Sequence, residues 1–293
     1  ICNILSCGVE ASIFAYAMSQ TLHLPIPSIG YTIIMTVIVM VANLFGVDMF
    51  AKIQNLVAFL LVGSMVVMGI IGALGLGTGQ VVSQPASMST NFFDIVSTTA
   101  VAFWLFIGAE YVIPISKDVK NARRNVPLGM FLGLGLICVV QSVLVFGFHN
   151  YTPWDKLADS AAPHLLYGEN LLGNVGKIWM AFVAALALIS SQNSAINGLA
   201  SICQGMAKMN MMPQFFAKTN KRKVPFFGVI FVSLTILIFA FISDSSSSAI
   251  SFLILVGSVF WMISYILAHI DVLILRKRVP NAPRSFKVPL GKI

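Results

Sequence analysis

Residues 94–127 read DIVSTTAVAFWLFIGAEYVIPISKDVKNARRNVP, an apolar segment followed by a basic loop. The apolar part, residues 94–115, is about long enough to cross the roughly 30 Å of hydrocarbon in a bilayer. Gly108 and Pro114 work against a plain helix, because glycine is a weak helix former and proline has no amide hydrogen for the carbonyl of Glu110. We therefore expect one turn of this helix to open inside the membrane.

An opened turn at this depth predicts a solute site. Backbone groups that leave helical hydrogen bonding in a bilayer are tolerated only where they face buried protein or a water-filled cavity. Glu110 lies beside the expected opening, and a charge at the bilayer centre costs at least about 2.5–3.5 kcal/mol. The carboxyl group therefore faces solute, or it is a protonated group that is hydrogen-bonded to a neighbouring helix.

The composition indicates an integral membrane protein. Of the 293 residues, 58% are hydrophobic and 10% are charged, and the mean hydropathy is +0.90, whereas a soluble domain carries about 25% charged residues. The net charge of +8 does not predict a nucleic-acid partner, because the basic residues fall in short blocks between apolar segments. The four cysteines lie in apolar segments without metal-ligand spacing, so no metal site is predicted.

Apolar segments separated by Pro, Gly, Asn or charged residues predict about eight transmembrane helices. If the segments alternate in direction, every Lys and Arg except Lys156 and Lys177 falls on one side, which should be the cytoplasm. Both ends of the chain are then cytoplasmic. The predicted helices are residues 2–21, 29–44, 49–74, 94–115, 127–148, 172–206, 226–242 and 249–275.

Side chains elsewhere in these segments are candidates for a cavity wall. Trp104 is too deep in its segment for an interfacial tryptophan, so its ring is predicted to stack on a cation or act as a lid, with core packing as the alternative. Glu10 either faces the cavity or is a buried neutral group. The polar run at 190–197 predicts a cavity wall, and bridging between helices is the alternative. The residues of this run predicted to line the cavity are Ser190, Ser191 and Asn193.

The remaining motifs argue against an enzyme. The sequence contains neither HExxH nor GxSxG, so we predict no catalytic residues and no cofactor. Gly75, Gly77 and Gly79 follow an apolar segment rather than a strand, which predicts a flexible turn on the outer side and not a nucleotide-binding loop.

Three separated motifs are shared with one family. They are FWLFIGAE at 103–110, followed by VKN at 119–121 and NVP at 125–127; GMAKMNMMP at 205–213, with VP at 224–225; and RSFKVP at 284–289. With these motifs the chain resembles the amino acid, polyamine and organocation transporter superfamily. They are similar to the family's sixth helix with its following loop, the end of the eighth helix with its following loop, and the segment before the eleventh helix.

The resemblance implies an all-α membrane protein with the leucine-transporter-like fold of two inverted five-helix repeats. The chain is similar to the family's helices three to ten, in one transmembrane domain over residues 1–293. Residues 1–75 would be the remainder of the first repeat, 92–275 the second, and 276–293 a cytoplasmic connection to a further helix. We expect a fragment of a longer protein, since residue 1 is Ile and the chain opens directly in apolar sequence.

The resemblance also implies a substrate site at the expected opening. Trp104 matches a gating aromatic that stacks on the substrate, and Glu110 matches an acidic gate residue. The substrate would lie against the backbone of Ile107, Gly108, Ala109 and Glu110.

The function expected from this resemblance is secondary active transport. A permease or antiporter would move an amino acid, polyamine or related amine across the plasma (inner) membrane by alternating access, with the solute and the lipid bilayer as its partners. One alternative is a non-transporting membrane sensor or partner subunit with the same fold. Another is a channel, which would need a continuous ring of polar groups rather than one interrupted helix.

Overall fold

The computed structural model describes residues 2–22, 24–84, 91–114, 116, 119–160, 162–242 and 247–282. The regular elements in these ranges are all helical, which confirms the predicted all-α fold class. The third family motif, at 284–289, lies outside the described residues. The elements are α1 Cys2–Leu22, α2 Ser28–Leu44, α3 Val47–Ala73, α4 Phe92–Ala102, η1 Phe103–Phe106, η2 Ala109–Val112, α5 Ala122–Tyr151, α6 Trp154–Asp159, α7 Pro163–Lys208, η4 Gln214–Ala217, α8 Phe226–Ile242 and α9 Ser247–Arg278.

Seven of the eight predicted apolar segments lie mainly within one α-helix each, and the fourth, residues 94–115, is divided among α4, η1 and η2. Four stretches are long and apolar enough to cross a bilayer, while α2 and α8, with 17 residues each, are somewhat short for that. The four long stretches are Ala51–Ala73, Ala122–Tyr151, Pro163–Lys208 and Leu255–Arg278.

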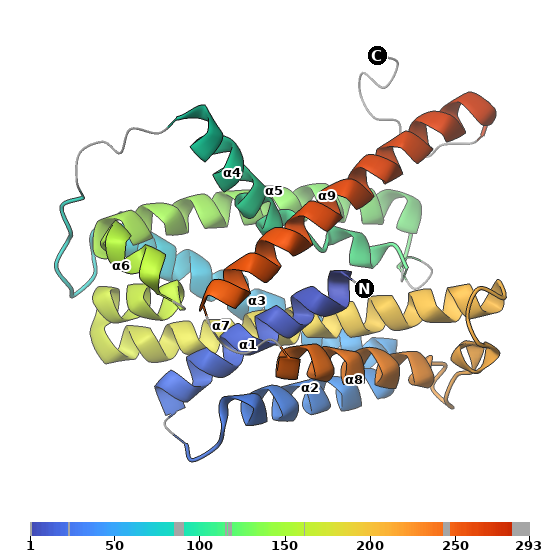
Figure 1. Cartoon of the computed structure of the whole chain (residues 1–293), viewed down its shortest axis with the longest axis horizontal. Helices are drawn as coiled ribbons and strands as arrows, with labels where there is room; N and C mark the ends of the chain where they lie inside the picture. Colours follow the sequence, from blue (N-terminus) through green and yellow to red (C-terminus); the bar gives the residue numbers. More distant parts are fainter. Residues whose placement is uncertain are drawn as a thin grey trace.

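Helix α7 is longer than one crossing requires. It has 46 residues and bends at Leu172 and Gly173, where φ at Gly173 is +63°. This conformation suits glycine because a side chain would crowd the backbone there. The part before the bend forms a short segment at one end of the bundle, and the part after it runs through the bundle (Figure 1).

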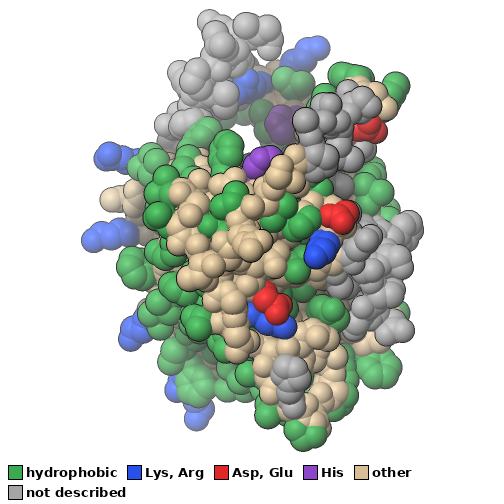
Figure 2. Space-filling view, turned by 90° about the vertical axis from the view of Figure 1, so that its left-hand side faces the viewer, with side chains coloured by type: hydrophobic (Ala, Val, Ile, Leu, Met, Phe, Trp, Pro, Cys, Tyr) green, Lys and Arg blue, Asp and Glu red, His purple; other side chains and the backbone are tan. Residues whose placement is uncertain are grey.

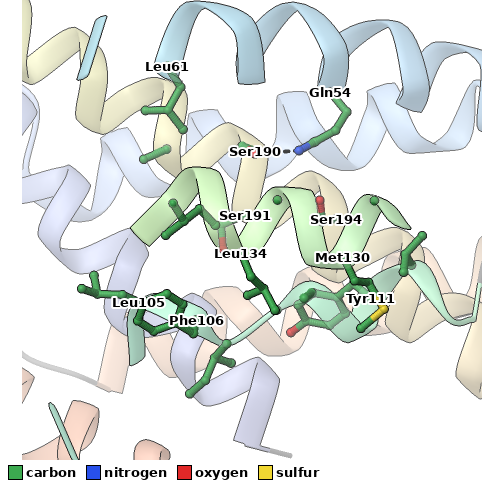
Figure 3. A pocket seen from close by; sticks show the side chains of 18 of the residues that line it. Gln54, Leu61, Leu105, Phe106, Tyr111, Met130, Leu134, Ser190, Ser191 and Ser194 are labelled. Carbon is green, nitrogen blue, oxygen red and sulfur yellow. Dashed lines mark hydrogen bonds between the residues drawn. The ribbon is translucent and has the colours of Figure 1, made fainter. Parts of the chain in front are cut away.

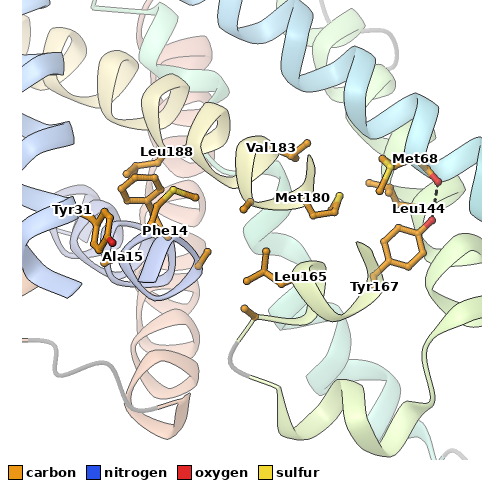
Figure 4. Packing of buried hydrophobic residues seen from close by; sticks show 14 of the residues in the cluster. Phe14, Ala15, Tyr31, Met68, Leu144, Leu165, Tyr167, Met180, Val183 and Leu188 are labelled. Carbon is orange, nitrogen blue, oxygen red and sulfur yellow. Dashed lines mark hydrogen bonds between the residues drawn. The ribbon is translucent and has the colours of Figure 1, made fainter. Parts of the chain in front are cut away.

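The helices form a bundle in which α3 packs against α5 and α7, and α1 packs against α2, α7 and α8. Met68 of α3, Leu144 of α5 and Tyr167 of α7 are buried together where these helices meet (Figure 4). The Tyr167 hydroxyl donates to the Met68 carbonyl oxygen at 2.8 Å, and its ring stacks on Phe148 with centroids 4.3 Å apart. Gly72 and Gly147 admit this ring, because a Cβ atom at either position would collide with the Tyr167 hydroxyl.

The glycine-containing loop after α3 is held in place rather than flexible, so the sequence prediction of a flexible turn is wrong. The Thr78 amide donates to the Leu171 carbonyl oxygen at 2.9 Å, and the Gly77 amide donates to the Tyr151 hydroxyl at 2.9 Å. Glycine is needed at Gly77 and Gly79 for close approach to α7, not for mobility, since a Cβ at either position would clash with the backbone of residues 170–171.

The two ends of the bundle differ in charge. The end with α6 and the bend of α7 shows few charged side chains (Figure 2), among them the ion pair between Lys177 and Glu169 at 3.3 Å. The opposite end holds the starts of α5 and α8 and the ends of α7 and α9 (Figure 1), where most of the described Lys and Arg residues occur.

Candidate functional site

The predicted break in the fourth apolar segment is present, and it is longer than one turn. Helix α4 ends at Ala102, and the chain continues through η1 to Ile107, which is extended, with φ −77° and ψ 142°. Gly108 follows at φ +112°, a conformation that residues with a side chain rarely adopt, and η2 begins after it.

The break lies at Ile107 and Gly108, not at the carbonyl that Pro114 was expected to leave vacant. The Glu110 carbonyl oxygen accepts the Ile113 amide at 2.9 Å. In a 3₁₀ helix the donor is three residues ahead, so the residue before the proline supplies the hydrogen that the proline lacks. Glycine rather than proline therefore determines where the helix opens.

Glu110 holds the break to α9. Its Oε2 atom accepts the Gly108 amide at 3.1 Å and the Tyr265 hydroxyl of α9 at 2.9 Å. Its Oε1 atom is buried and has no hydrogen-bond partner within the described residues. Glu110 is not among the residues that line the cavity described next, so its direct contact with a substrate stays a prediction.

A cavity of about 600 Å³ lies beside the break, between η1, η2, α1, α3, α5 and α7 (Figure 3). The four other residues predicted at the break all line it, and the Trp104 ring packs on Gly257 of α9, where a Cβ would lie 2.8 Å from the ring. These residues are Trp104, Ile107, Gly108 and Ala109.

The wall opposite the break is formed by α1, α3 and α7. Glu10 of α1 accepts a hydrogen bond from the Ser191 hydroxyl of α7, and both residues line the cavity, as does Ser190. Ser190 accepts the Gln54 Nε2 amide of α3 at 2.7 Å, and Ser194 lies one turn further along α7 (Figure 3).

Asn193 lies behind this wall, and it is not among the residues that line the cavity. It is fully buried, accepts Nδ2 of Asn43 at 2.9 Å and donates its own Nδ2 to Oε1 of Gln54 at 3.2 Å. Gln192 is also fully buried and accepts the Thr36 hydroxyl of α2 at 3.2 Å. Successive helical residues differ by about 100° in direction, so the polar run both lines the cavity and bridges helices.

Sequence reasoning missed three important side chains of this region. Gln54 joins the cavity wall to the network behind it, and Tyr111 lines the cavity while packing against Gly198 of α7. Tyr265 bonds Glu110 from α9. Gln54 carried a usable signal, because an amide in an apolar helix is expected to find a hydrogen-bond partner.

The cavity lining carries little charge. Glu10 is the only charged side chain among the described residues that line it, and the remaining lining is apolar apart from hydroxyl, thiol and amide groups. The described residues contain no cluster of three or more His, Cys, Asp or Glu that could hold a metal ion.

Comparisons with known proteins match the chain to a family. Residues 1–293 match a family model described as amino acid permease. The chain is 28% identical over 193 residues to the mitochondrial cationic amino acid transporter 3 of Arabidopsis thaliana, covering 64% of this chain and 30% of that protein. It is 24% identical over 272 residues to the vacuolar cationic amino acid transporter 4 of the same plant, covering 87% and 43%.

A bacterial relative matches over a similar region. The chain is 28% identical over 255 residues to the putrescine transporter PotE of Escherichia coli K12, covering 84% of this chain and 56% of that protein. The alignments thus span between 30% and 56% of the length of these relatives. Because the family model matches the whole chain, the chain is an integral membrane protein that belongs to the amino acid permease family.

Proposed function

We propose that the protein containing this chain is a secondary active transporter for a cationic amino acid or polyamine. The observation that carries the proposal is the Glu10 carboxylate on the wall of the cavity beside the broken helix. The relatives are named as transporters of cationic amino acids and of putrescine, and those solutes carry positive charge at neutral pH.

The charge on Glu10 needs a partner. Ser191 donates its hydroxyl to Oε2, while Oε1 makes no hydrogen bond within the described residues. A carboxylate in the membrane interior is costly unless it is paired or hydrated. An ammonium group of the substrate would pair with it, and the described cavity lining contains no Lys, Arg or His to compete.

The other side of the cavity supplies complementary groups. The Trp104 ring lines the cavity and can stack on a cation, an interaction worth about 0.5–2 kcal/mol. The extended backbone at Ile107 and the turn at Gly108 border the same space. A long cationic solute would then be held at one end by Glu10 and along its length by the broken helix.

We further propose that the protein lies in the plasma (inner) membrane and works by alternating access. Both ends of the chain would then lie in the cytoplasm. The α5 lining runs from Asn125 to Ile137, about 18 Å along the half of α5 nearest the basic end. Basic loops favour the cytoplasmic side, so the cavity would be reached from the cytoplasm in this conformation. The predicted repeats, residues 1–75 and 92–275, would move relative to each other to expose the opposite side.

The test is uptake by the full-length protein in liposomes. Liposomes that are preloaded with unlabelled putrescine, arginine or lysine should accumulate the same cation in labelled form. Leucine and glutamate should compete only weakly with this uptake. Glu10→Gln should weaken cation binding by about 30-fold, because it leaves the ammonium group unpaired in a buried site. Glu169→Gln is the matched control and should leave cation binding unchanged. Glu169 forms the ion pair with Lys177 at the end of the bundle that holds α6, away from the cavity lining.

Two results would contradict the proposal. Binding of the cations without exchange across the membrane would indicate a sensor or partner subunit. Equal affinities of the wild type and the Glu10→Gln protein for the cations would remove the proposed role of this carboxylate.

A further inference from the structure

A basic surface lies at the end of the bundle where α7 ends and α8 begins. It is formed by residues 208–225, and we name it the α7–α8 surface. Its exposed cations make no ion pair within the described part of the chain, and the sequence has no Asp or Glu between Glu169 and Asp244. The cations are Lys208, Lys218, Lys221, Arg222 and Lys223.

This surface is joined to the end of α2 by hydrogen bonds and by a cation–π contact. Asn220 donates Nδ2 to the Leu44 carbonyl oxygen at 3.0 Å, and its Oδ1 accepts the amides of Arg222 at 2.9 Å and Val224 at 3.0 Å. The Arg222 guanidinium lies 4.3 Å from the centre of the Phe45 ring. Arg222 therefore fixes the loop, while Lys221 and Lys223 on either side of it remain exposed.

Large apolar side chains are exposed next to these cations. Met209 and Met211 are 64% and 66% exposed, and Phe215 is 45% exposed. They lie between Lys208, at the end of α7, and Lys218. Apolar side chains beside lysines at the end of a membrane helix suit the boundary between headgroups and acyl chains, where each kind of side chain meets its preferred surroundings.

We propose that the α7–α8 surface binds the headgroups of anionic phospholipids. Lys218, Lys221 and Lys223 would contact lipid phosphates, and the exposed methionines would enter the adjoining acyl layer. A soluble phosphate would satisfy the lysines but would leave the methionines in water, so the observations favour a lipid. The proposal depends on membrane embedding and not on what the cavity transports.

Native mass spectrometry of the full-length protein in detergent can test this with phosphatidylglycerol and phosphatidylcholine as probes. The wild type should retain phosphatidylglycerol preferentially. Each lysine near an anionic surface contributes about fivefold in affinity, so the Lys218→Gln/Lys221→Gln/Lys223→Gln protein should bind this lipid about 100-fold more weakly.

Two control proteins distinguish binding at the α7–α8 surface from nonspecific electrostatic attraction of the lipid to any basic residues. Lys156→Gln/Lys177→Gln removes cations from the opposite end and should not change retention. Replacing the basic residues at the end of α9, Arg276, Lys277 and Arg278, by Gln should reduce retention much less than the loop variant does. An equal loss in the α9 variant, or no loss in the loop variant, would overturn the proposal.

A further variant distinguishes lipid from a soluble anion. Met209→Ser/Met211→Ser keeps every charge. It should weaken the binding of phosphatidylglycerol without changing the binding of inorganic phosphate. Unchanged lipid binding in this variant would contradict the lipid assignment. Thermal unfolding of each variant, monitored by circular dichroism, confirms that the proteins compared are folded.

Discussion

Removing the Tyr265 hydroxyl should loosen the broken helix. In Tyr265→Phe, Glu110 Oε2 loses the bond of 2.9 Å and keeps only the Gly108 amide at 3.1 Å. A hydrogen bond to a charged group contributes about 1.5–3 kcal/mol, and the Oε1 atom of the same carboxylate is already buried without a partner in the described chain. We expect the free energy of unfolding to fall by about 2 kcal/mol, which is about 30-fold in the unfolding equilibrium.

The measurement is equilibrium unfolding of the full-length protein in mixed detergent micelles. Tyr31→Phe is a matched control, because the Tyr31 hydroxyl is buried and has no hydrogen-bond partner within the described residues. Removing an unsatisfied hydroxyl should be neutral or slightly stabilising. The two variants lose the same atom, so a difference between them reports the hydrogen bond and not the change in volume.

A double-mutant cycle with Glu110→Gln then locates the effect. If the hydroxyl acts through Glu110, the two changes should be strongly non-additive, with an interaction free energy of about 1–2 kcal/mol. Additive losses, or a Tyr265→Phe protein as stable as Tyr31→Phe, would refute the reasoning that this carboxylate ties the break to α9.

Two glycine substitutions test the backbone itself. Gly108→Ala should destabilise the protein by about 1–2 kcal/mol, because φ is +112° at this residue, and a protein of unchanged melting temperature would contradict the observed break. Gly72→Ala should lower the melting temperature because its Cβ would collide with the Tyr167 hydroxyl and would lie 2.8 Å from the Cα of Gly147. Gly63→Ala, in the same helix with nothing near its Cβ, should instead be neutral or stabilising, and equal effects of the two changes would argue against the close packing.

The fold could be predicted from the sequence because apolar length and glycine placement are local properties. Seven of the eight predicted segments lie mainly within one α-helix each, and the fourth breaks at Gly108, one of the two residues that the sequence marked as opposing a plain helix. The predicted repeats and site residues depend on how helices meet. A pattern within one helix cannot show which distant helix supplies the partner of a polar side chain.

The polar run in α7 illustrates this limit. Ser191 meets Glu10, and Ser190 meets Gln54, although these pairs are separated by 181 and 136 positions in the sequence. Asn193 has the same polar character but turns to Asn43 and Gln54 behind the wall. The number of polar residues in the run predicted that polar contacts exist here. Which helix each side chain contacts depends on how α1, α2 and α3 pack around α7, and the sequence pattern does not show this.

Glu110 and Glu10, the two acidic residues predicted to lie deep in the membrane, differ in their hydrogen bonds and in their access to the cavity. We therefore expect them to have different roles. One oxygen of Glu110 accepts the Gly108 amide and the Tyr265 hydroxyl, so this carboxyl group is committed to holding the break. Glu10 has one hydrogen bond from Ser191 and faces the cavity. Neutralising Glu110 should therefore change stability and the rate of conformational exchange more than the choice of solute. Neutralising Glu10 should change the preference for cations, since no other charged side chain is available on the described wall to replace it.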